Sequence, residues 1–305
     1  MKIFLQKNHK FKGIHRLVEG FTIHPEFEII EVATIEEVAK YECESGIFAG
    51  FLPSQLNFVK SVKNKYYVYC SPLGQADLSS HDFYSVEFNT LIDAEYFRKE
   101  GKIKGIITGS ESLEFSNNFI CMPHVRLDIE DHIKFKDERF NYGFMGNNFR
   151  KHRNVSNQIA AISKLNPKED IVVSHRSLYD HYEKMYDCKI IDKPANSTED
   201  YFNEISSHIL GFQCSWSEAF NYITWEYAFM GVPCIVSPTI PWYPIPELIV
   251  MNPDDPKEIY ETAQELLDNQ RLYGETSMYL ADWALEYNKE QKMKLMGKLE
   301  ELLKE

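Results

Sequence analysis

Residues 215–238 read SWSEAFNYITWEYAFMGVPCIVSP, and this stretch predicts a loop, a helix, a turn and a strand in succession. The polar residues from Ser215 to Asn221 predict the loop, and the residues after them predict a helix of about two to three turns. Gly231 can adopt the left-handed conformation that ends a helix. Cys234–Val236 predicts a short buried strand. The stretch is therefore typical of one unit of a parallel α/β sheet.

Two carboxylates flank the start of this helix: Glu218 lies in the loop, and Glu226 lies about one turn inside the helix. The first N–H groups of a helix and its dipole favour an anion. Carboxylates around such a site suit a ligand that carries both phosphates and hydroxyl groups. A nucleotide sugar is such a ligand. We expect Glu226 at the lip of a cleft, outside the hydrophobic core.

The order Glu218-x7-Glu226, with Phe220 between the glutamates and Gly231-Val232-Pro233 after them, resembles the signature of family-4 glycosyltransferases of the GT-B type. Asn221 stands where that signature usually has Gly. The resemblance implies an α/β GT-B fold: two Rossmann-like, doubly wound domains face a cleft, and a C-terminal helix crosses back to the first domain. It also implies transfer of a sugar from a nucleotide diphosphate sugar to an acceptor, with retention of configuration.

Strand and helix patterns divide the chain into two halves. We expect residues 1–135 to form a Rossmann-like acceptor-binding domain, with strands at Lys2–Gln6 and Glu28–Val32 and a helical stretch over 34–44. We expect residues 136–305 to form a Rossmann-like donor domain. Its final helices, over 257–305, would pack back on the first domain.

A basic cluster follows the first strand of the second half. In the family this turn carries Gly-Arg, but here Gly146 is followed by Asn147. The positive charges come later, at Arg150, Lys151 and Arg153. Guanidinium and ammonium groups bind phosphate oxygens, so the cluster predicts a diphosphate site. Which of the three cations contacts the diphosphate is left open.

The resemblance implies that Glu218 contacts the transferred sugar and that Glu226 binds the ribose hydroxyls. Backbone N–H groups at the start of the helix would face the diphosphate. The predicted catalytic residues are Glu218, Arg150 and Arg153. The predicted donor-binding residues are Glu226, Gly146, Lys151, Phe220, Asn221, Tyr222 and Ile223. With cations and N–H donors in place, we expect no cofactor and no required metal.

Composition limits the partners. The net charge of −13 disfavours a nucleic-acid partner. Six cysteines without a C-x-x-C pair predict reduced thiols in a cytoplasmic protein. A basic run near the start leaves peripheral membrane contact open; it comprises Lys2, Lys7, Lys10, Lys12 and Arg16.

Other activities are compatible with the same fold. A sugar-nucleotide epimerase or phosphorylase would also have two such domains, but the two glutamates favour a transferase. A catalytically degenerate nucleotide-sugar-binding or scaffold protein is the alternative, and Asn147 is the residue that favours it. His15 and His124 are further candidates for contacts in the cleft. The sequence does not indicate the base, the sugar or the acceptor.

Overall fold

The structure of the protein is a computed structural model that describes residues 1–7, 12–71, 81–110, 113, 119–145, 151–166, 168–174 and 180–305. The chain divides into two compact units. Unit 1 comprises Met1–Leu127 and Asn288–Glu305, and unit 2 comprises Asp128–Tyr287. Within the described residues, no helix is both long enough and apolar enough to cross a lipid bilayer.

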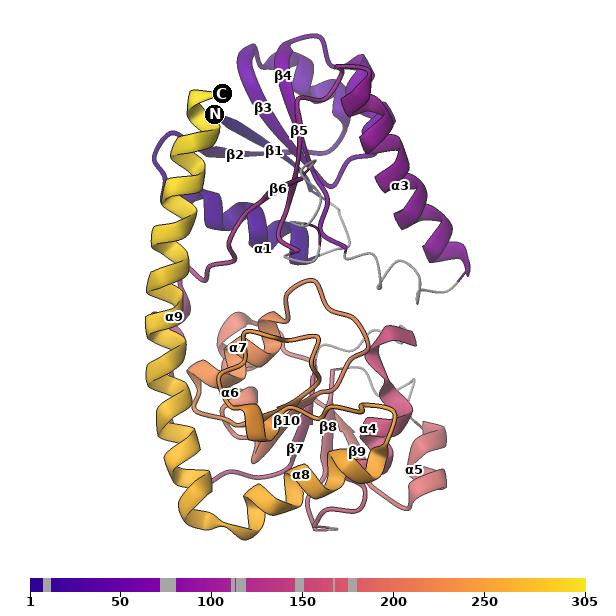
Figure 1. The fold of residues 1–305 in the computed structure, drawn as a ribbon, viewed down its shortest axis with the longest axis vertical. Helices are drawn as coiled ribbons and strands as arrows, with labels where there is room; N and C mark the ends of the chain where they lie inside the picture. The colour runs from indigo at the N-terminus through magenta and orange to yellow at the C-terminus, as the bar shows by residue number, and fades with distance from the viewer. Residues whose placement is uncertain are drawn as a thin grey trace. The chain divides into compact units, whose positions relative to one another are not determined.

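The described residues of unit 1 form a six-stranded sheet with the strand order β2-β1-β3-β4-β5-β6 (Figure 1). Every neighbouring pair is parallel. The strands are β1 (Lys2–Gln6), β2 (Glu28–Val32), β3 (Cys43–Ala49), β4 (Val62–Val68), β5 (Gly105–Thr108) and β6 (Phe119–Cys121). Parallel sheets need cover on both faces, and unit 1 has two separate hydrophobic cores, one on each face.

One face of this sheet packs against α1 (Lys12–Gly20) and the end of α9 (Gln270–Lys304). The other face packs against α3 (His81–Lys99) and the 3₁₀ helices η2 (Ile35–Lys40) and η3 (Pro53–Phe58). The helical stretch predicted over 34–44 is therefore wrong in type and in length. Ile35 and Val38 are buried three residues apart, which suits a 3₁₀ turn, and β3 begins at Cys43 because that residue pairs with Val62.

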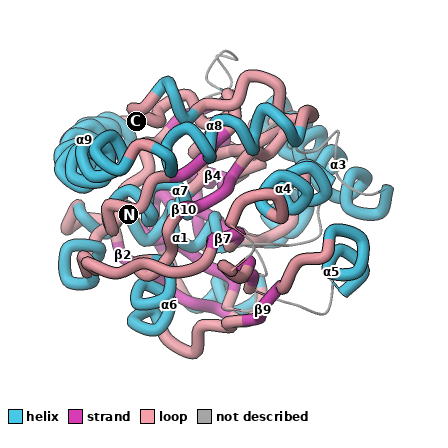
Figure 2. The backbone as a smooth tube through the Cα atoms, turned by 90° about the horizontal axis from the view of Figure 1, so that it is seen from below, coloured by secondary structure: helices cyan, strands magenta, loops and turns pink. Residues whose placement is uncertain are grey.

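The described residues of unit 2 form a five-stranded parallel sheet with the order β11-β10-β7-β8-β9. The strands are β7 (Tyr142–Phe144), β8 (Ile171–Val173), β9 (Ile190–Asp192), β10 (Leu210–Gln213) and β11 (Cys234–Val236). The helices are α4 (Val155–Ile162), α5 (Asp180–Tyr186), α6 (Thr198–Ile205), α7 (Tyr222–Phe229), α8 (Pro256–Asp268) and the first part of α9. α4 contacts α5, and α6 contacts α7; the two pairs lie on opposite sides of the strands (Figure 2).

Strand order reverses direction between β7 and β10. From β7 the chain continues to β8 on one side, and from β10 it continues to β11 on the other side. In open α/β sheets, ligands bind outside the carboxyl ends of the strands at such a reversal. Topology alone thus places the candidate site of unit 2 at the carboxyl ends of β7 and β10.

Two strand glycines let α7 lie close to this sheet. A Cβ on Gly143 of β7 would lie 1.9 Å from Oη of Tyr227, and a Cβ on Gly211 of β10 would lie 2.7 Å from the ring of Tyr227. The buried Tyr227 of α7 occupies the space that both glycines leave. At the other end of α7, Gly231 has φ +62° and ends the helix as predicted.

α9 belongs to both units, because the division of the chain falls inside it at Tyr287 and Asn288. The predicted C-terminal helix that returns to the first domain is therefore confirmed. In unit 1, the buried Asn288 accepts a hydrogen bond from the backbone N–H of Arg126 at 3.0 Å and donates one to the carbonyl of Arg126 at 2.9 Å. These two bonds fix α9 to the end of the first stretch of unit 1.

Candidate active site

The loop from Cys214 to Asn221, which we call the signature loop, follows β10 directly and leads into α7. It therefore lies at the carboxyl edge of the sheet, beside the ends of β7 and β11. The strand order reverses between β7 and β10, so the loop lies at the position where ligands bind in such sheets. The predicted anion site and the site expected from topology coincide.

Buried amide side chains hold the start of this loop. Gln158 of α4 accepts a hydrogen bond from the N–H of Cys214 at 2.8 Å and donates one to the carbonyl of Arg153 at 2.7 Å. Asn154 has a left-handed backbone (φ +52°) and donates to the carbonyl of Cys214 at 3.1 Å. The signature loop is thus fixed to Asn154, which lies 60 residues before Cys214, and through Gln158 to Arg153.

The next part of the loop is bonded on both sides. The carbonyl of Ser215 accepts hydrogen bonds from Ser237 at 2.5 Å and from Thr239 at 3.2 Å, both just after β11. Trp216 donates its backbone N–H to the carbonyl of His152 at 2.7 Å and its indole N–H to Asp254 at 2.6 Å. These bonds order the backbone that carries Glu218.

Glu218 forms an ion pair with Arg153. Its Oε1 accepts hydrogen bonds from Nη1 of Arg153 and, at 3.2 Å, from Nδ2 of Asn221. The side chains of Arg153 and Glu218 are 19% and 5% exposed, so the pair is largely shielded from water. The predicted catalytic carboxylate and one of the predicted cations are therefore neighbours.

Asn221 caps α7. Its Oδ1 accepts a hydrogen bond from the N–H of Thr224 at 3.0 Å, and its Nδ2 donates to Gln213 at 2.9 Å as well as to Glu218. Asn is among the best residues at this position, so the residue that departs from the family signature has a structural reason here. An Asn directly before an apolar helix was the sequence signal for this role.

Glu226 is fully buried, which contradicts the expectation that it lies at a cleft lip outside the core. Its Oε2 accepts a hydrogen bond from Oη of Tyr201 on α6 at 2.8 Å. The cause is the helix itself: α7 is buried along nearly its whole length and contacts both α6 and the strands β10 and β11. A polar residue on such a helix is internal whichever way it faces.

The aromatic residues at the start of α7 serve packing. Phe220 stacks on Trp242 with ring centroids 4.9 Å apart, and Trp242 lies parallel to Trp283 of α9. Tyr222 is buried, and Ile223 packs against the core of unit 2. What this segment offers an anion is therefore the positive end of the α7 dipole rather than its side chains.

Arg139 was not predicted from the sequence, yet it holds the other end of α7. Its guanidinium donates to the carbonyls of Gly231 at 2.7 Å and Met230 at 3.0 Å, and to the hydroxyl of Tyr273 on α9 at 3.1 Å. A cation at a helix C-terminus complements the dipole. Arg139 thus stabilises the helix that carries Glu226.

Part of the predicted phosphate site lies outside the described residues, namely Gly146, Asn147 and Arg150. Lys151 begins the 3₁₀ helix η6 (Lys151–Arg153), and only its backbone is described. Of the three predicted cations, Arg153 is the one whose side-chain position is known. Across the described residues, no group of three or more His, Cys, Asp or Glu side chains has the arrangement of a metal site.

No protein-family model matches the sequence, and neither does any curated protein sequence. Solved structures do match over the whole chain. HepE from Anabaena, in complex with UDP, has a TM-score of 0.70 at 10% identity, covering 99% of this chain and 98% of that chain. Sucrose-phosphate synthase from Thermosynechococcus elongatus has a TM-score of 0.70 at 14% identity, with 99% of each chain covered. A glycosyltransferase from Rickettsia africae has a TM-score of 0.61 at 11% identity, covering 99% of this chain and 97% of that chain.

The chain has the GT-B fold. In GT-B terms, unit 2 is the second Rossmann-like domain, and its signature loop lies at the strand ends where the order reverses. Identities of 10–14% establish the fold and not the activity. The activity depends on the residues of the site and not on the fold alone.

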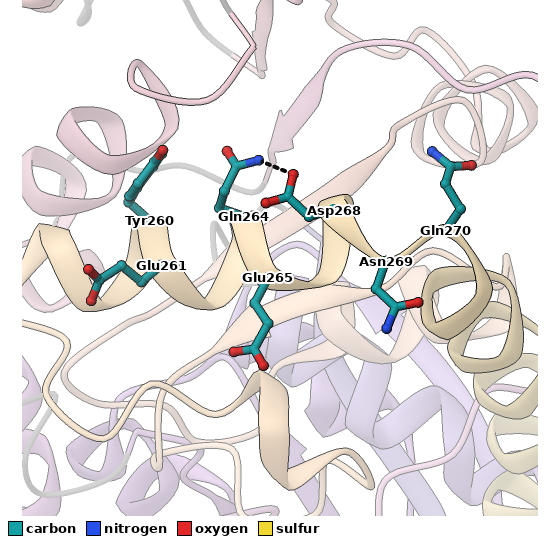
Figure 3. A pocket seen from close by; sticks show the side chains of 7 residues that line it. All are labelled: Tyr260, Glu261, Gln264, Glu265, Asp268, Asn269 and Gln270. Atoms are coloured by element: carbon teal, nitrogen blue, oxygen red, sulfur yellow. Dashed lines mark hydrogen bonds between the residues drawn. The ribbon is translucent and has the colours of Figure 1, made fainter.

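An open groove in unit 2 is separate from the candidate active site and has no residue in common with it. It runs along α8 to the start of α9 and is lined by Tyr260, Glu261, Gln264, Glu265, Asp268, Asn269 and Gln270 (Figure 3). Gln264 donates a hydrogen bond to Asp268 at 2.7 Å. Three acidic side chains in the lining would repel a diphosphate, so the groove is not the donor site of a GT-B protein.

Burial keeps two thiols and one imidazole of the described residues in their neutral forms. Burial raises the pKa of the Cys214 and Cys234 thiols, so neither is a ready thiolate nucleophile. In unit 1, His124 is buried with Nε2 2.7 Å from the carbonyl of Gly109, and burial lowers its pKa to about 4. His124 is therefore a neutral packed residue at neutral pH. His15 lies on α1 and is half-buried.

Proposed function

We propose that the protein is a glycosyltransferase. Unit 2 would bind a nucleotide diphosphate sugar at the carboxyl ends of β7, β10 and β11, and the sugar would move to an acceptor not yet identified. The observation that carries this proposal is the pairing of Glu218 with Arg153 directly before the amino end of α7. It gathers a carboxylate, a cation and a helix dipole at one place.

The structural neighbours support a nucleotide-sugar donor. HepE was solved in complex with UDP and with UDP-glucose, and it matches nearly the whole of this chain. We propose the same class of donor, a nucleotide diphosphate sugar, for this chain. The base and the sugar are left to experiment.

The expected chemistry explains why a cation and a carboxylate would lie together. Glycosyl transfer from such a donor breaks the C1–O bond, so positive charge develops on the sugar and negative charge on the leaving diphosphate. Arg153 would stabilise the diphosphate together with the α7 dipole, and Arg150 or Lys151 would add charge. Glu218 would accept hydrogen bonds from sugar hydroxyls. Before the donor arrives, the ion pair keeps both side chains ordered.

Glu226 would bind the ribose hydroxyls in this proposal. Because Glu226 is buried, its carboxylate has to become accessible when the nucleotide enters. The hydroxyl of Tyr201 is a neutral O–H donor, and a ribose hydroxyl is also a neutral O–H donor. We propose that the ribose replaces Tyr201 as the hydrogen-bond partner of Glu226.

The finer features of the reaction are also proposals. Retention of configuration is supported by the resemblance of the Glu218–Glu226 spacing to retaining enzymes. Metal independence is supported by Arg153 and its basic neighbours, which can neutralise the leaving group. We also propose a cytoplasmic location, with peripheral membrane contact through the N-terminal basic residues Lys2, Lys7, Lys10, Lys12 and Arg16.

A panel of UDP-, GDP-, ADP- and CMP-sugars tests the proposal through thermal unfolding. A donor at 100 times its Kd should stabilise the fold by ~2.7 kcal/mol. The stabilising donor is then offered to candidate glycan, lipid and protein acceptors, with and without EDTA. Transfer that EDTA abolishes and magnesium restores would refute metal independence. No stabilisation by any donor of the panel would refute the donor site.

One observation favours the alternative of a binding or scaffold protein without catalysis. Both signature glutamates have hydrogen-bond donors from within unit 2, namely Arg153 and Asn221 for Glu218 and Tyr201 for Glu226. A degenerate site would keep such internal pairs permanently. It would bind a nucleotide sugar without hydrolysing or transferring it, so binding without turnover separates the two functions.

A further inference from the structure

Gln213 is a polar residue at the end of a buried strand. All four residues of β10 are buried, and Gln213, the last of them, is 2% exposed. A buried amide is unfavourable unless it is hydrogen-bonded. Gln213 is not among the residues that the sequence indicated for the site. The partners of its amide show what it contributes.

The amide of Gln213 joins β7 to the signature loop. β7 and β10 are neighbouring strands of the unit 2 sheet (Figure 1). Nε2 of Gln213 donates a hydrogen bond to the carbonyl of Met145, the residue after β7, at 3.0 Å. Oε1 of the same amide accepts one from Nδ2 of Asn221 at 2.9 Å. The exit of β7 is thus connected to the last residue of the signature loop.

The chemistry of the partners fixes the orientation of this amide. A backbone carbonyl can only accept a hydrogen bond, so the amide nitrogen of Gln213 has to face Met145. The amide oxygen then faces Asn221 and needs a donor there, which is Nδ2. The opposite orientation of Gln213 would place its oxygen against the Met145 carbonyl, so that two acceptors would face each other.

The amide of Asn221 has the same orientation when it is assigned from its other side. The backbone N–H of Thr224 can only donate, and it donates to Oδ1 of Asn221 at 3.0 Å. Nδ2 is therefore on the side of Gln213, as the Met145 carbonyl also requires. Amide orientations are assigned from such networks, and here two separate backbone groups give one answer.

Both hydrogens of Nδ2 are engaged within the protein. One is donated to Gln213, and the other is donated to Oε1 of Glu218 at 3.2 Å. The same carboxylate oxygen also accepts a hydrogen bond from Arg153. Asn221 therefore transmits the orientation of Gln213 to the carboxylate of Glu218.

The cation of the ion pair has a separate support. Gln158 is fully buried, donates to the carbonyl of Arg153 at 2.7 Å and accepts from the N–H of Cys214 at 2.8 Å. Arg153 and Glu218 thus depend on two different glutamines. Loss of the Gln213 amide would release the carboxylate and leave the backbone of Arg153 in place.

We propose that Gln213 is a positioning residue for the proposed glycosyl transfer. Through Asn221 it holds Glu218 where the transferred sugar would bind. The role given to Glu218 rests on the proposed function, whereas the chain of hydrogen bonds does not. A misplacement of about 1 Å at a reacting centre can lower the rate about 100-fold, so an amide bonded inside the protein can control turnover.

Gln213→Met keeps the length of the side chain and removes both hydrogen bonds. It should lower kcat by up to about 100-fold. Affinity for the free nucleotide should change little, because Arg153 keeps its own support. Kinetics with the donor that stabilises the fold in the thermal panel, and calorimetry with its free nucleotide, separate the two quantities. Gln213→Leu is the second variant if the Met variant does not fold.

Tyr243→Phe is the matched control. It also removes a buried hydrogen bond in unit 2, which the hydroxyl of Tyr243 accepts from the N–H of Cys234 at 2.9 Å. Cys234 is the first residue of β11, at the opposite end of that strand from the site, so kcat should stay at the wild-type value. A kcat of Gln213→Met equal to that of the control would overturn the proposal. A loss of nucleotide affinity as large as the loss of kcat would also overturn it.

Urea unfolding tests the chain of hydrogen bonds without any donor. Gln213→Met/Glu218→Ala should lose less stability than the sum of the two single variants. In an Asn221→Ala background the two losses should become additive, as should those of Gln213→Met/Tyr243→Phe in the native background. Additive losses for Gln213 and Glu218 with Asn221 present would overturn the proposal. Wild-type protein that transfers no sugar would refute the proposed function instead, and the unfolding cycle would still show whether Gln213 holds Glu218.

Discussion

Tyr201 donates a hydrogen bond from Oη to Oε2 of Glu226 at 2.8 Å, in the interior of unit 2. The two residues come from α6 and α7, which are adjacent helices on one side of the sheet. The carboxylate that the signature assigns to the nucleotide is therefore also part of the packing between these helices. Substitutions at Glu226 should affect stability as well as binding.

Glu226→Ala should lower the free energy of unfolding by ~1–3 kcal/mol, because it removes the acceptor of a buried hydroxyl. It should also weaken nucleoside diphosphate binding by ~1.5–3 kcal/mol through loss of charge-assisted hydrogen bonds. Urea unfolding followed by tryptophan fluorescence measures the first effect, since all four tryptophans lie in unit 2. Tyr201→Phe is the control: it breaks the same internal bond but keeps the carboxylate. Wild-type nucleotide affinity in Glu226→Ala would contradict the ribose role.

Arg153→Ala should lower kcat by ~10²–10³, the effect of removing one preorganised electrostatic donor. Arg271→Ala is the matched control, because Arg271 is 87% exposed and forms a surface pair with Glu275 that contributes little. Turnover of Arg153→Ala equal to that of the control would move the phosphate contact to Arg150 or Lys151, and single Ala variants there would then identify it.

Glu218→Gln should lower kcat far more than it changes nucleoside diphosphate affinity. Gln can still accept the hydrogen bond from Asn221, but it lacks the charge that pairs with Arg153 and with developing positive charge on the sugar. Steady-state kinetics and calorimetry with the free nucleoside diphosphate separate the two quantities. The assignment fails if kcat stays near normal, or if nucleotide affinity falls as much as in Glu226→Ala.

Asn221→Ala should cost ~1 kcal/mol of stability through loss of the α7 cap, and it should also lower turnover. The reason for the second effect is that Nδ2 of Asn221 holds Glu218. Ser197→Ala removes a comparable cap from α6, where Oγ accepts from the N–H of Asp200 at 3.0 Å. That control should lose similar stability with normal turnover. Equal turnover in the two variants would show that Asn221 acts only as a cap.

His124 should make unit 1 less stable in acid. Burial lowers its pKa from 6.5 to about 4, so the folded protein keeps it neutral while the unfolded chain binds a proton below pH 6.5. Above pH 6.5 the neutral His124 makes its full contribution to the free energy of unfolding. As the pH falls toward 4, this contribution is lost, and the free energy of unfolding decreases by up to about 3 kcal/mol. His124→Gln should flatten this dependence in circular dichroism melts. A pH profile that is unchanged in the variant would rule out His124 as the cause.

Local patterns in the sequence were enough for much of the fold. β1, β2 and β11 have the predicted bounds because each is a short run of mostly β-branched and apolar residues. α3 was not predicted, since its apolar residues recur on several sides of the helix and give no clear stripe. The stretch 34–44 failed because propensity could not indicate that Cys43 pairs with β4.

The sequence indicates candidate residues for the site but not the partners of these residues. The signature picks out Glu218 and Glu226, yet Arg153 is 65 residues from Glu218 and Tyr201 is 25 residues from Glu226. Such pairs depend on tertiary packing. The burial of Glu226 did leave a trace in the sequence: Trp225, Tyr227, Ala228 and Phe229 surround it with apolar residues on every face of α7, which is typical of an internal helix.

The division of α9 between the units also affects how the chain can fold during synthesis. Leu295, Leu299 and Leu302 lie in the same core of unit 1 as Ile3 and Leu17, so that core is incomplete until these turns of α9 have left the ribosome. Unit 2 is continuous from Asp128 to Tyr287 and has its whole core beforehand. Domains commonly fold in the order of their synthesis. Here unit 1 is translated first but cannot complete its core until α9 has been made. During that time its incomplete core is exposed to proteases and to aggregation.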